Sequence, residues 1–142
     1  MHLPEETFQI IASLTNRAKI EMARNDYPRA LEFFQKAEHS FPQPADNYTG
    51  ACFLFYSTGE LLLQMQRTDE ALGYFTRAAA CADELTDAKI YYQLGLIHLH
   101  NGNTTEAKQQ LLKAYGMGGE TLFTSKADSD VDFFSKHIFQ TA

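Results

Sequence analysis

The sequence predicts an all-α protein made of three helix pairs, followed by a short seventh helix. Two stretches, residues 52–85 and 88–121, repeat each other 36 residues apart. The identical residues include the pairs Tyr56/Tyr92, Gly59/Gly95, Leu63/Leu99, Ala71/Ala107 and Ala78/Ala114. In both copies small residues recur at offsets of 12 and 7, which suits points where two helix backbones approach closely. Such a pattern indicates a repeat protein, whose function is expected in a binding surface.

The first pair is predicted from apolar periodicity and from two breaks in it. Residues 6–24 form the first helix, and Asn25-Asp26 supplies a turn. Tyr27-Pro28 begins the second helix, because proline is tolerated in a first turn. This helix stops before Phe41-Pro42-Gln43-Pro44, since proline disfavours helical geometry in the preceding residue. The apolar residues at helical spacing in this pair are Phe8, Ile11, Leu14, Ala18, Met22, Ala30, Leu31, Phe34 and Ala37.

The second and third pairs follow the same reasoning. The third helix is expected over residues 46–66, and the fourth begins at Thr68, whose hydroxyl would cap it. The fifth helix covers about residues 87–101, and Thr104 would cap the sixth, which stops at Gly116-Met117-Gly118-Gly119. The inward residues are expected to be Phe55, Gly59, Leu62, Met65, Ala71, Leu72, Phe75, Ala78, Tyr91, Leu94, Gly95, His98, Ala107, Leu111 and Ala114. A final helix, about residues 129–139, would cover the apolar face of the last pair.

The spacing of large and small residues resembles the tetratricopeptide repeat. The second repeat reads Phe55, Gly59, Ala71, Phe75 and Ala78. The third reads Tyr91, Gly95, Ala107, Leu111 and Ala114. The first reads Leu14, Ala18, Ala30, Phe34 and Ala37, with Pro42 at the closing proline position. The resemblance implies one domain over residues 1–142, with repeats at about 11–44, 52–85 and 88–121 in a short right-handed superhelical stack. A period of 36 and a longer junction around Phe41–Tyr48 depart from the family pattern.

A narrower resemblance is to small bacterial tetratricopeptide proteins found beside polymorphic-toxin genes. It is carried by Phe41-Pro42-Gln43-Pro44, by the run from Ala114 to Phe123, and by the acidic-aromatic run from Asp130 to Phe134. This resemblance implies an immunity role and a toxin domain as the partner. It assigns no contact residues.

Composition and charge limit the classes of function that the chain can have. The chain has 142 residues, with 18 acidic against 12 basic residues and a net charge of −6, which favours a basic partner over nucleic acid or a membrane surface. No apolar run approaches the roughly 18 residues of a membrane span, and no secretory signal is visible, so a cytoplasmic protein is expected. Cys52 and Cys81 lie in apolar helical patterns and are predicted to be buried and reduced. We expect no metal, cofactor or catalytic residue, because no complete ligand set or catalytic group is recognisable.

The predicted binding surface is the concave face, which the first helix of each pair lines in tetratricopeptide stacks. Its residues would be Phe53, Tyr56, Glu60, Leu63, Gln64, Lys89, Tyr92, Leu96, Leu99 and His100, with Thr15, Lys19 and Met22 from the first pair. Tyr56 and Tyr92 occupy equivalent positions and are expected to be largely exposed side by side. The alternative is that a terminus of the chain fills this groove.

Two functions remain open at this point. The first is a non-catalytic protein-binding module that acts as an immunity protein and neutralises a basic toxin domain. The second is a small secretion or folding chaperone that holds an apolar segment of a client protein. The oligomeric state is left open.

Overall fold

The computed structural model describes residues 2–48, 50–81 and 88–119, which form two compact units, Met1–Thr86 and Asp87–Ala142. The first unit contains α1 (Glu5–Ala23), α2 (Tyr27–Ser40), α3 (Ala51–Gln64) and α4 (Thr68–Ala80). The second contains α5 (Ala88–His100), α6 (Thr104–Ala114) and the π-helical turn η2 (Tyr115–Gly119). The predicted helix at 129–139 lies outside the described residues.

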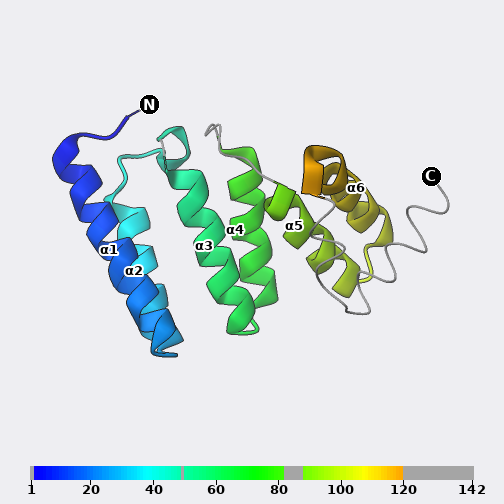
Figure 1. The fold of residues 1–142 in the computed structure, drawn as a ribbon, viewed down its shortest axis with the longest axis horizontal. Helices are drawn as coiled ribbons and strands as arrows, with labels where there is room; N and C mark the ends of the chain where they lie inside the picture. Colours follow the sequence, from blue (N-terminus) through cyan, green and yellow to red (C-terminus); the bar gives the residue numbers. More distant parts are fainter. Residues whose placement is uncertain (1, 49, 82–87, 120–142) are drawn as a thin grey trace. The chain divides into compact units, whose positions relative to one another are not determined.

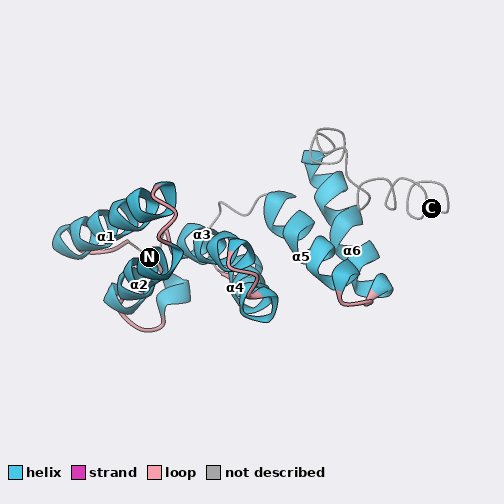
Figure 2. Cartoon of the chain, turned by 90° about the horizontal axis from the view of Figure 1, so that it is seen from below, coloured by secondary structure: helices cyan, strands magenta, loops and turns pink. Residues whose placement is uncertain are grey.

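The helices of each unit pack in consecutive pairs (Figures 1 and 2). α1 packs against α2, α3 against α4, and α5 against α6, while α2 also contacts α3 within the first unit. The described elements are all helical, so the predicted fold class is confirmed. No described helix is both long and apolar enough to cross a membrane.

Small residues lie at the closest approach within two of the pairs, as the sequence predicts. A Cβ atom built on Gly59 would stand 2.8 Å from Cε1 of Phe75, and one built on Gly95 would stand 2.2 Å from Cγ of Leu111. Ala71 and Ala107, twelve residues further on, are buried. A large residue of the second helix therefore fills the space that each glycine leaves open.

The predicted cores are confirmed at most positions. Ala18, Ala30, Phe34 and Ala37 are buried in the first pair, as are their counterparts in the other two. Phe8 departs from the prediction, because it lies exposed in the first turn of α1. The cysteines agree with the prediction: both thiols are free and buried, and the sulfur atoms of Cys52 and Cys81 lie 2.8 and 3.3 Å from the carbonyl oxygen of Ala78.

The three turns inside the pairs share one main-chain conformation. Asn25, Gln66 and Gly102 have φ angles of 63°, 61° and 80°, in the left-handed region. The next N–H in each turn donates to a carbonyl five residues earlier, at 2.9, 2.9 and 2.8 Å. These are the bonds that typically satisfy the last carbonyls of a helix that ends on a left-handed residue.

Because of this turn, the predicted threonine caps of the fourth and sixth helices are wrong. Arg67 and Asn103 are the N-cap residues of α4 and α6, and neither makes a side-chain cap bond. Thr68 and Thr104 are the first helical residues, because the turn ends one residue earlier than a threonine cap requires. Asp26 differs, since its carboxylate accepts from the backbone N–H of Arg29 at 3.3 Å.

The predicted start of the third helix, in the junction between the first two pairs, is wrong. The sequence predicted a helix from residue 46, but α3 begins at Ala51 because Gly50 has a φ of 94°, outside the helical region. Ala45–Asn47 instead form a 3-10 turn that packs against α3. Phe41 and Ala45 are buried, so the extra residues add a small layer to the core.

A polar cluster fastens α4 to α2 in the first unit. The Tyr74 hydroxyl donates to Oε1 of Glu38 at 2.7 Å, and Arg77 pairs with Oε2 of Glu38 at 3.0 Å. The Arg77 guanidinium also lies 4.0 Å from the ring centroid of Phe55. Burial, followed by the hydrogen bond to Glu38, raises the pKa of Tyr74 to about 12.

The raised pKa of Tyr74 predicts a loss of stability at high pH. An unfolded tyrosine ionises near pH ~10, so the contribution is complete below that pH and is lost as the pH rises towards 12. We expect the free energy of unfolding, measured with denaturant, to fall more steeply between these values in the natural chain than in Tyr74→Phe. Tyr27→Phe serves as the control for removing a tyrosine. Equal slopes in the natural chain and Tyr74→Phe would contradict the raised pKa of Tyr74.

Candidate protein-binding face

The first unit brings predicted site residues of α1 and α3 together. The ammonium of Lys19 on α1 lies 5.3 Å from the ring centroid of Phe53 on α3, a cation–π distance. Phe53 is 52 % exposed, and Lys19 is exposed beside it. We call the predicted residues of these two helices the α1–α3 face: Thr15, Lys19, Met22, Phe53, Tyr56, Glu60, Leu63 and Gln64.

The remaining residues of the α1–α3 face differ in exposure. Glu60 and Gln64 are exposed, whereas Met22 and Leu63 are half-buried. Tyr56 is half-buried as well, and its ring centroid lies 5.5 Å from that of Phe75, at an interplanar angle of 59°. Tyr56 therefore contributes to the core of the second pair and presents only part of its ring to a partner.

The second unit carries the other predicted residues on α5. Lys89 and His100 are exposed at its two ends, and Leu96 and Leu99 are half-buried between them. Tyr92 is only 2 % exposed and Tyr56 is half-buried, so the expectation that both repeat tyrosines are largely exposed is wrong. A ring that is buried in the fold serves packing first, and truncating it would test stability more than binding.

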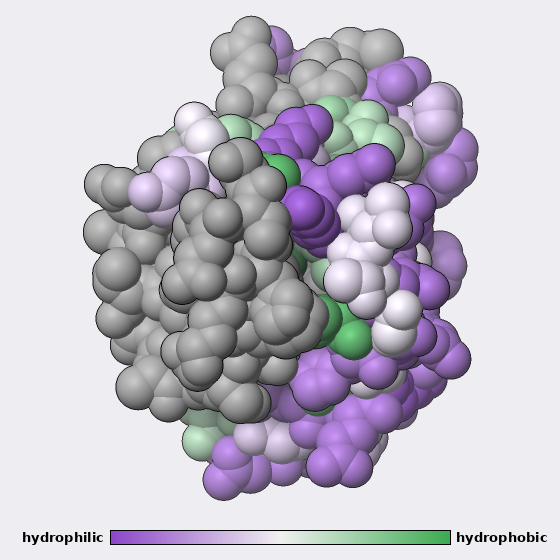
Figure 3. Space-filling view, turned by 90° about the vertical axis from the view of Figure 1, so that its right-hand side faces the viewer, coloured by the Kyte–Doolittle hydropathy of each residue, from purple (hydrophilic) through white to green (hydrophobic). Residues whose placement is uncertain are grey.

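Polar residues make up most of the exposed surface described on α6. Figure 3 looks onto the side that carries α6, where the described surface is mostly hydrophilic with smaller hydrophobic areas. Thr105, Glu106 and Gln109 are exposed on this helix. The exposed apolar residues near its end are Leu112, Tyr115 and Met117.

The first unit contains a pocket that was not predicted from the sequence. A pocket of about 300 Å³ is lined by Arg17, Ile20, Glu21, Arg24, Arg29 and Phe33. The sequence does show the two sets of residues: Arg17 on α1 lies seven residues before Arg24, the C-cap of that helix, and Arg29 and Phe33 are four apart on α2. Sequence alone does not reveal that these two sets of residues meet. In the described ranges, no group of three or more His, Cys, Asp or Glu side chains could hold a metal ion.

The family comparison agrees with the repeats found in the sequence. The tetratricopeptide repeat family matches residues 56–119, from within α3 to the end of η2. No curated protein matches the chain. The family match thus covers most of the second and third pairs, while the first pair, whose spacing is weaker at its start, falls outside it.

Solved structures share the fold at low sequence identity. The second TPR of Spaghetti (RPAP3), bound to the HSP90 peptide SRMEEVD, has a TM-score of 0.64 and 20 % identity over 77 % of this chain and 93 % of that chain. YrrB, a TPR protein with an unusual peptide-binding site, has a TM-score of 0.61 and 21 % identity; the match covers 73 % of this chain and 49 % of that chain. MamA 41-end from Desulfovibrio magneticus RS-1 has a TM-score of 0.62 and 23 % identity; the match covers 75 % of this chain and 55 % of that chain. The chain thus has a tetratricopeptide-like fold.

Proposed function

We propose that this chain is a non-catalytic protein-binding module that holds a segment of a partner protein on its α1–α3 face. The observation that carries the proposal is the half-exposed Phe53 beside the exposed Lys19, an apolar anchor next to a cation. Large aromatic side chains with charged neighbours are typical of binding hot spots. Two proteins of similar fold are described with a bound peptide or a peptide-binding site, which supports a peptide or protein ligand.

The sharper form of the proposal is an immunity protein that neutralises a bacterial toxin domain in the cytoplasm. The net charge of −6 suits a basic partner such as a nuclease, because opposite net charges speed association. The same charge disfavours nucleic acid and anionic membranes as direct ligands. The resemblance to tetratricopeptide proteins encoded beside toxin genes points to the same partner.

The second candidate is a secretion or folding chaperone. It is favoured by the apolar members of the α1–α3 face, Met22, Phe53 and Leu63, which suit an extended apolar segment. A growth assay separates the two functions: cells that express a candidate toxin domain, taken from the genes beside this one, should survive only when the chain is co-expressed. Survival without the chain, together with stabilisation of a neighbouring secretion substrate, would favour the chaperone instead.

Phe53→Ala tests the binding face directly. We expect it to weaken affinity for the toxin domain by about 1–2 kcal/mol, because truncation removes the apolar anchor. Isothermal titration calorimetry with the purified domain provides the affinity. The fold should persist, because about half of the ring is already in solvent.

Ile10→Ala is the matched control for this variant. Ile10 is 49 % exposed, and its place in α1 puts it on the side opposite Lys19. Its truncation should leave affinity unchanged. If Ile10→Ala weakened binding while Phe53→Ala did not, the partner would contact a different face of α1 and the proposal would be wrong.

A further inference from the structure

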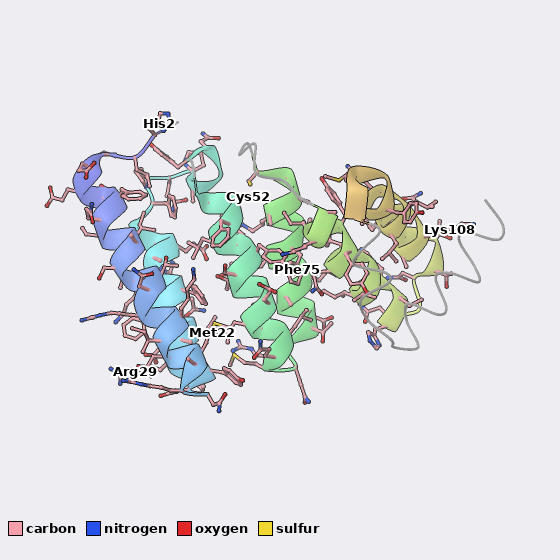
Figure 4. The ribbon with its side chains drawn as sticks, viewed as in Figure 1. His2, Met22, Arg29, Cys52, Phe75 and Lys108 are labelled. Carbon is pink, nitrogen blue, oxygen red and sulfur yellow. The ribbon has the colours of Figure 1, made fainter. Side chains whose placement is uncertain are left out.

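We infer that the pocket between α1 and α2 binds an acidic peptide segment that carries an apolar residue next to its carboxylates. This site goes beyond the α1–α3 face. Arg17 is two residues from Lys19, so the two side chains leave α1 in widely different directions. Arg29 lies near the turn that joins α1 to α2, at the end of the pair away from His2 (Figure 4).

Charge is the first reason for this assignment. The pocket lining contains three guanidinium groups and one carboxylate, a net charge of +2 in a chain whose total is −6. The carboxylate of Glu21 is engaged by Arg24 at 3.1 Å. The nearby Asp26 accepts from the backbone N–H of Arg29 at the start of α2. Among the described residues, neither Arg17 nor Arg29 has an ion pair, so two guanidinium groups are left for a ligand.

The ring of Phe33 organises these cations. The guanidinium carbons of Arg17 and Arg29 and the ammonium of Lys36 each lie 5.7 Å from its centroid. A cation that packs against a ring is held there without consuming its N–H donors. The N–H edges of a guanidinium can then donate in pairs to the two oxygens of a carboxylate.

Apolar surface and size favour a peptide over a free anion. Ile20 is 50 % exposed at the pocket, and Phe33 is half-buried in it, so an oxyanion alone would leave apolar area uncovered. A volume of about 300 Å³ is at the lower end for ligand pockets, which suits one or two side chains. An aspartate or glutamate followed by a leucine or phenylalanine fits both requirements.

The test uses the full chain and a blocked, fluorescein-labelled hexapeptide that alternates Asp with Leu. Fluorescence anisotropy should show saturable binding, and the same peptide with Asn for Asp should not bind. The double variant Arg17→Gln/Arg29→Gln should raise the Kd at least about tenfold, because each guanidinium donates to a carboxylate. Phe33→Leu should weaken binding as well, since it keeps apolar volume but removes the ring that holds the cations.

Two matched variants place the site. Arg67→Gln removes one positive charge from a surface pair with Glu70 outside the pocket and should leave the Kd unchanged. Lys19→Gln removes one positive charge from the α1–α3 face and should also leave the Kd of the Asp-Leu peptide unchanged. Loss of binding in Lys19→Gln alone would assign the peptide to the α1–α3 face and overturn the inference. Lack of any binding, equal binding of the Asn peptide, or full competition by inorganic phosphate or a short single-stranded DNA at equal concentration would overturn it too.

Discussion

Phe75→Ala should lower the free energy of unfolding by about 3–5 kcal/mol, the usual cost of removing a large aromatic side chain from a core. Phe75 is fully buried on α4 and fills the space opposite Gly59. Its ring also packs against Tyr56, which would lose its neighbour. Gly59 has no side chain that could move into the cavity, so little of the loss can be recovered by relaxation. Chemical denaturation followed by circular dichroism measures the change.

Phe53→Ala is the control for Phe75→Ala, because the same atoms are removed from a ring that is half in solvent. A loss of about 0.5 kcal/mol is expected there. Phe75, in contrast, lies within the second pair (Figure 4). Equal losses in the two variants would mean that Phe75 is not the central side chain of its pair.

Gly95→Ala should destabilise the chain by about 3 kcal/mol, at the upper end for overpacking in a core. The added Cβ would overlap Cγ, Cδ1 and Cδ2 of Leu111, at 2.2, 2.5 and 2.8 Å. Rotation about χ2 leaves Cγ of Leu111 in place, and its burial opposes a change of χ1, so the clash is relieved mainly by separating α5 from α6. Ordinarily the same substitution in a helix interior is favourable, because alanine has the higher helix propensity.

Gly73→Ala provides that ordinary case. Gly73 is exposed on α4, and nothing lies within 4 Å of the point where an added Cβ atom would stand, so the variant should gain about 0.5–1 kcal/mol. The double variant Gly95→Ala/Leu111→Ala should lose less than the sum of its two single variants, because Leu111→Ala removes the atoms that the added Cβ would overlap and the added Cβ fills part of the cavity. Additive losses would show that Gly95 and Leu111 do not touch.

The sequence was informative where packing requires a particular residue size. Gly59 and Gly95 stand opposite Phe75 and Leu111 as the repeat spacing predicts, because no larger residue fits between the paired helices. The Ala30, Leu31 and Phe34 cluster was also predictable, since helical period fixes which side of α2 faces its partner.

The sequence was less informative where the outcome depends on neighbouring elements. Tyr56 and Tyr92 are identical residues at equivalent positions, yet one is half-buried and the other almost fully buried. Repeat alignment gives a side chain its direction, but its exposure depends on what packs beside it. The start of α3 was also missed, although residues 46–50 are all weak helix formers and Gly50 adopts a left-handed conformation directly before the helix.

The shared turn inside the helix pairs has a consequence for where this chain can change length. Main-chain bonds close all three turns, and the small residues on either side are 12 apart in each pair: Ala18 to Ala30, Gly59 to Ala71 and Gly95 to Ala107. An insertion there would break the bond pattern and shift the glycine or alanine contact out of register. By contrast, Ala30 to Ala71 spans 41 residues and Ala71 to Ala107 spans 36. We therefore expect insertions, engineered tags and fused peptides to be accommodated between pairs, where the longer junction between α2 and α3 lies.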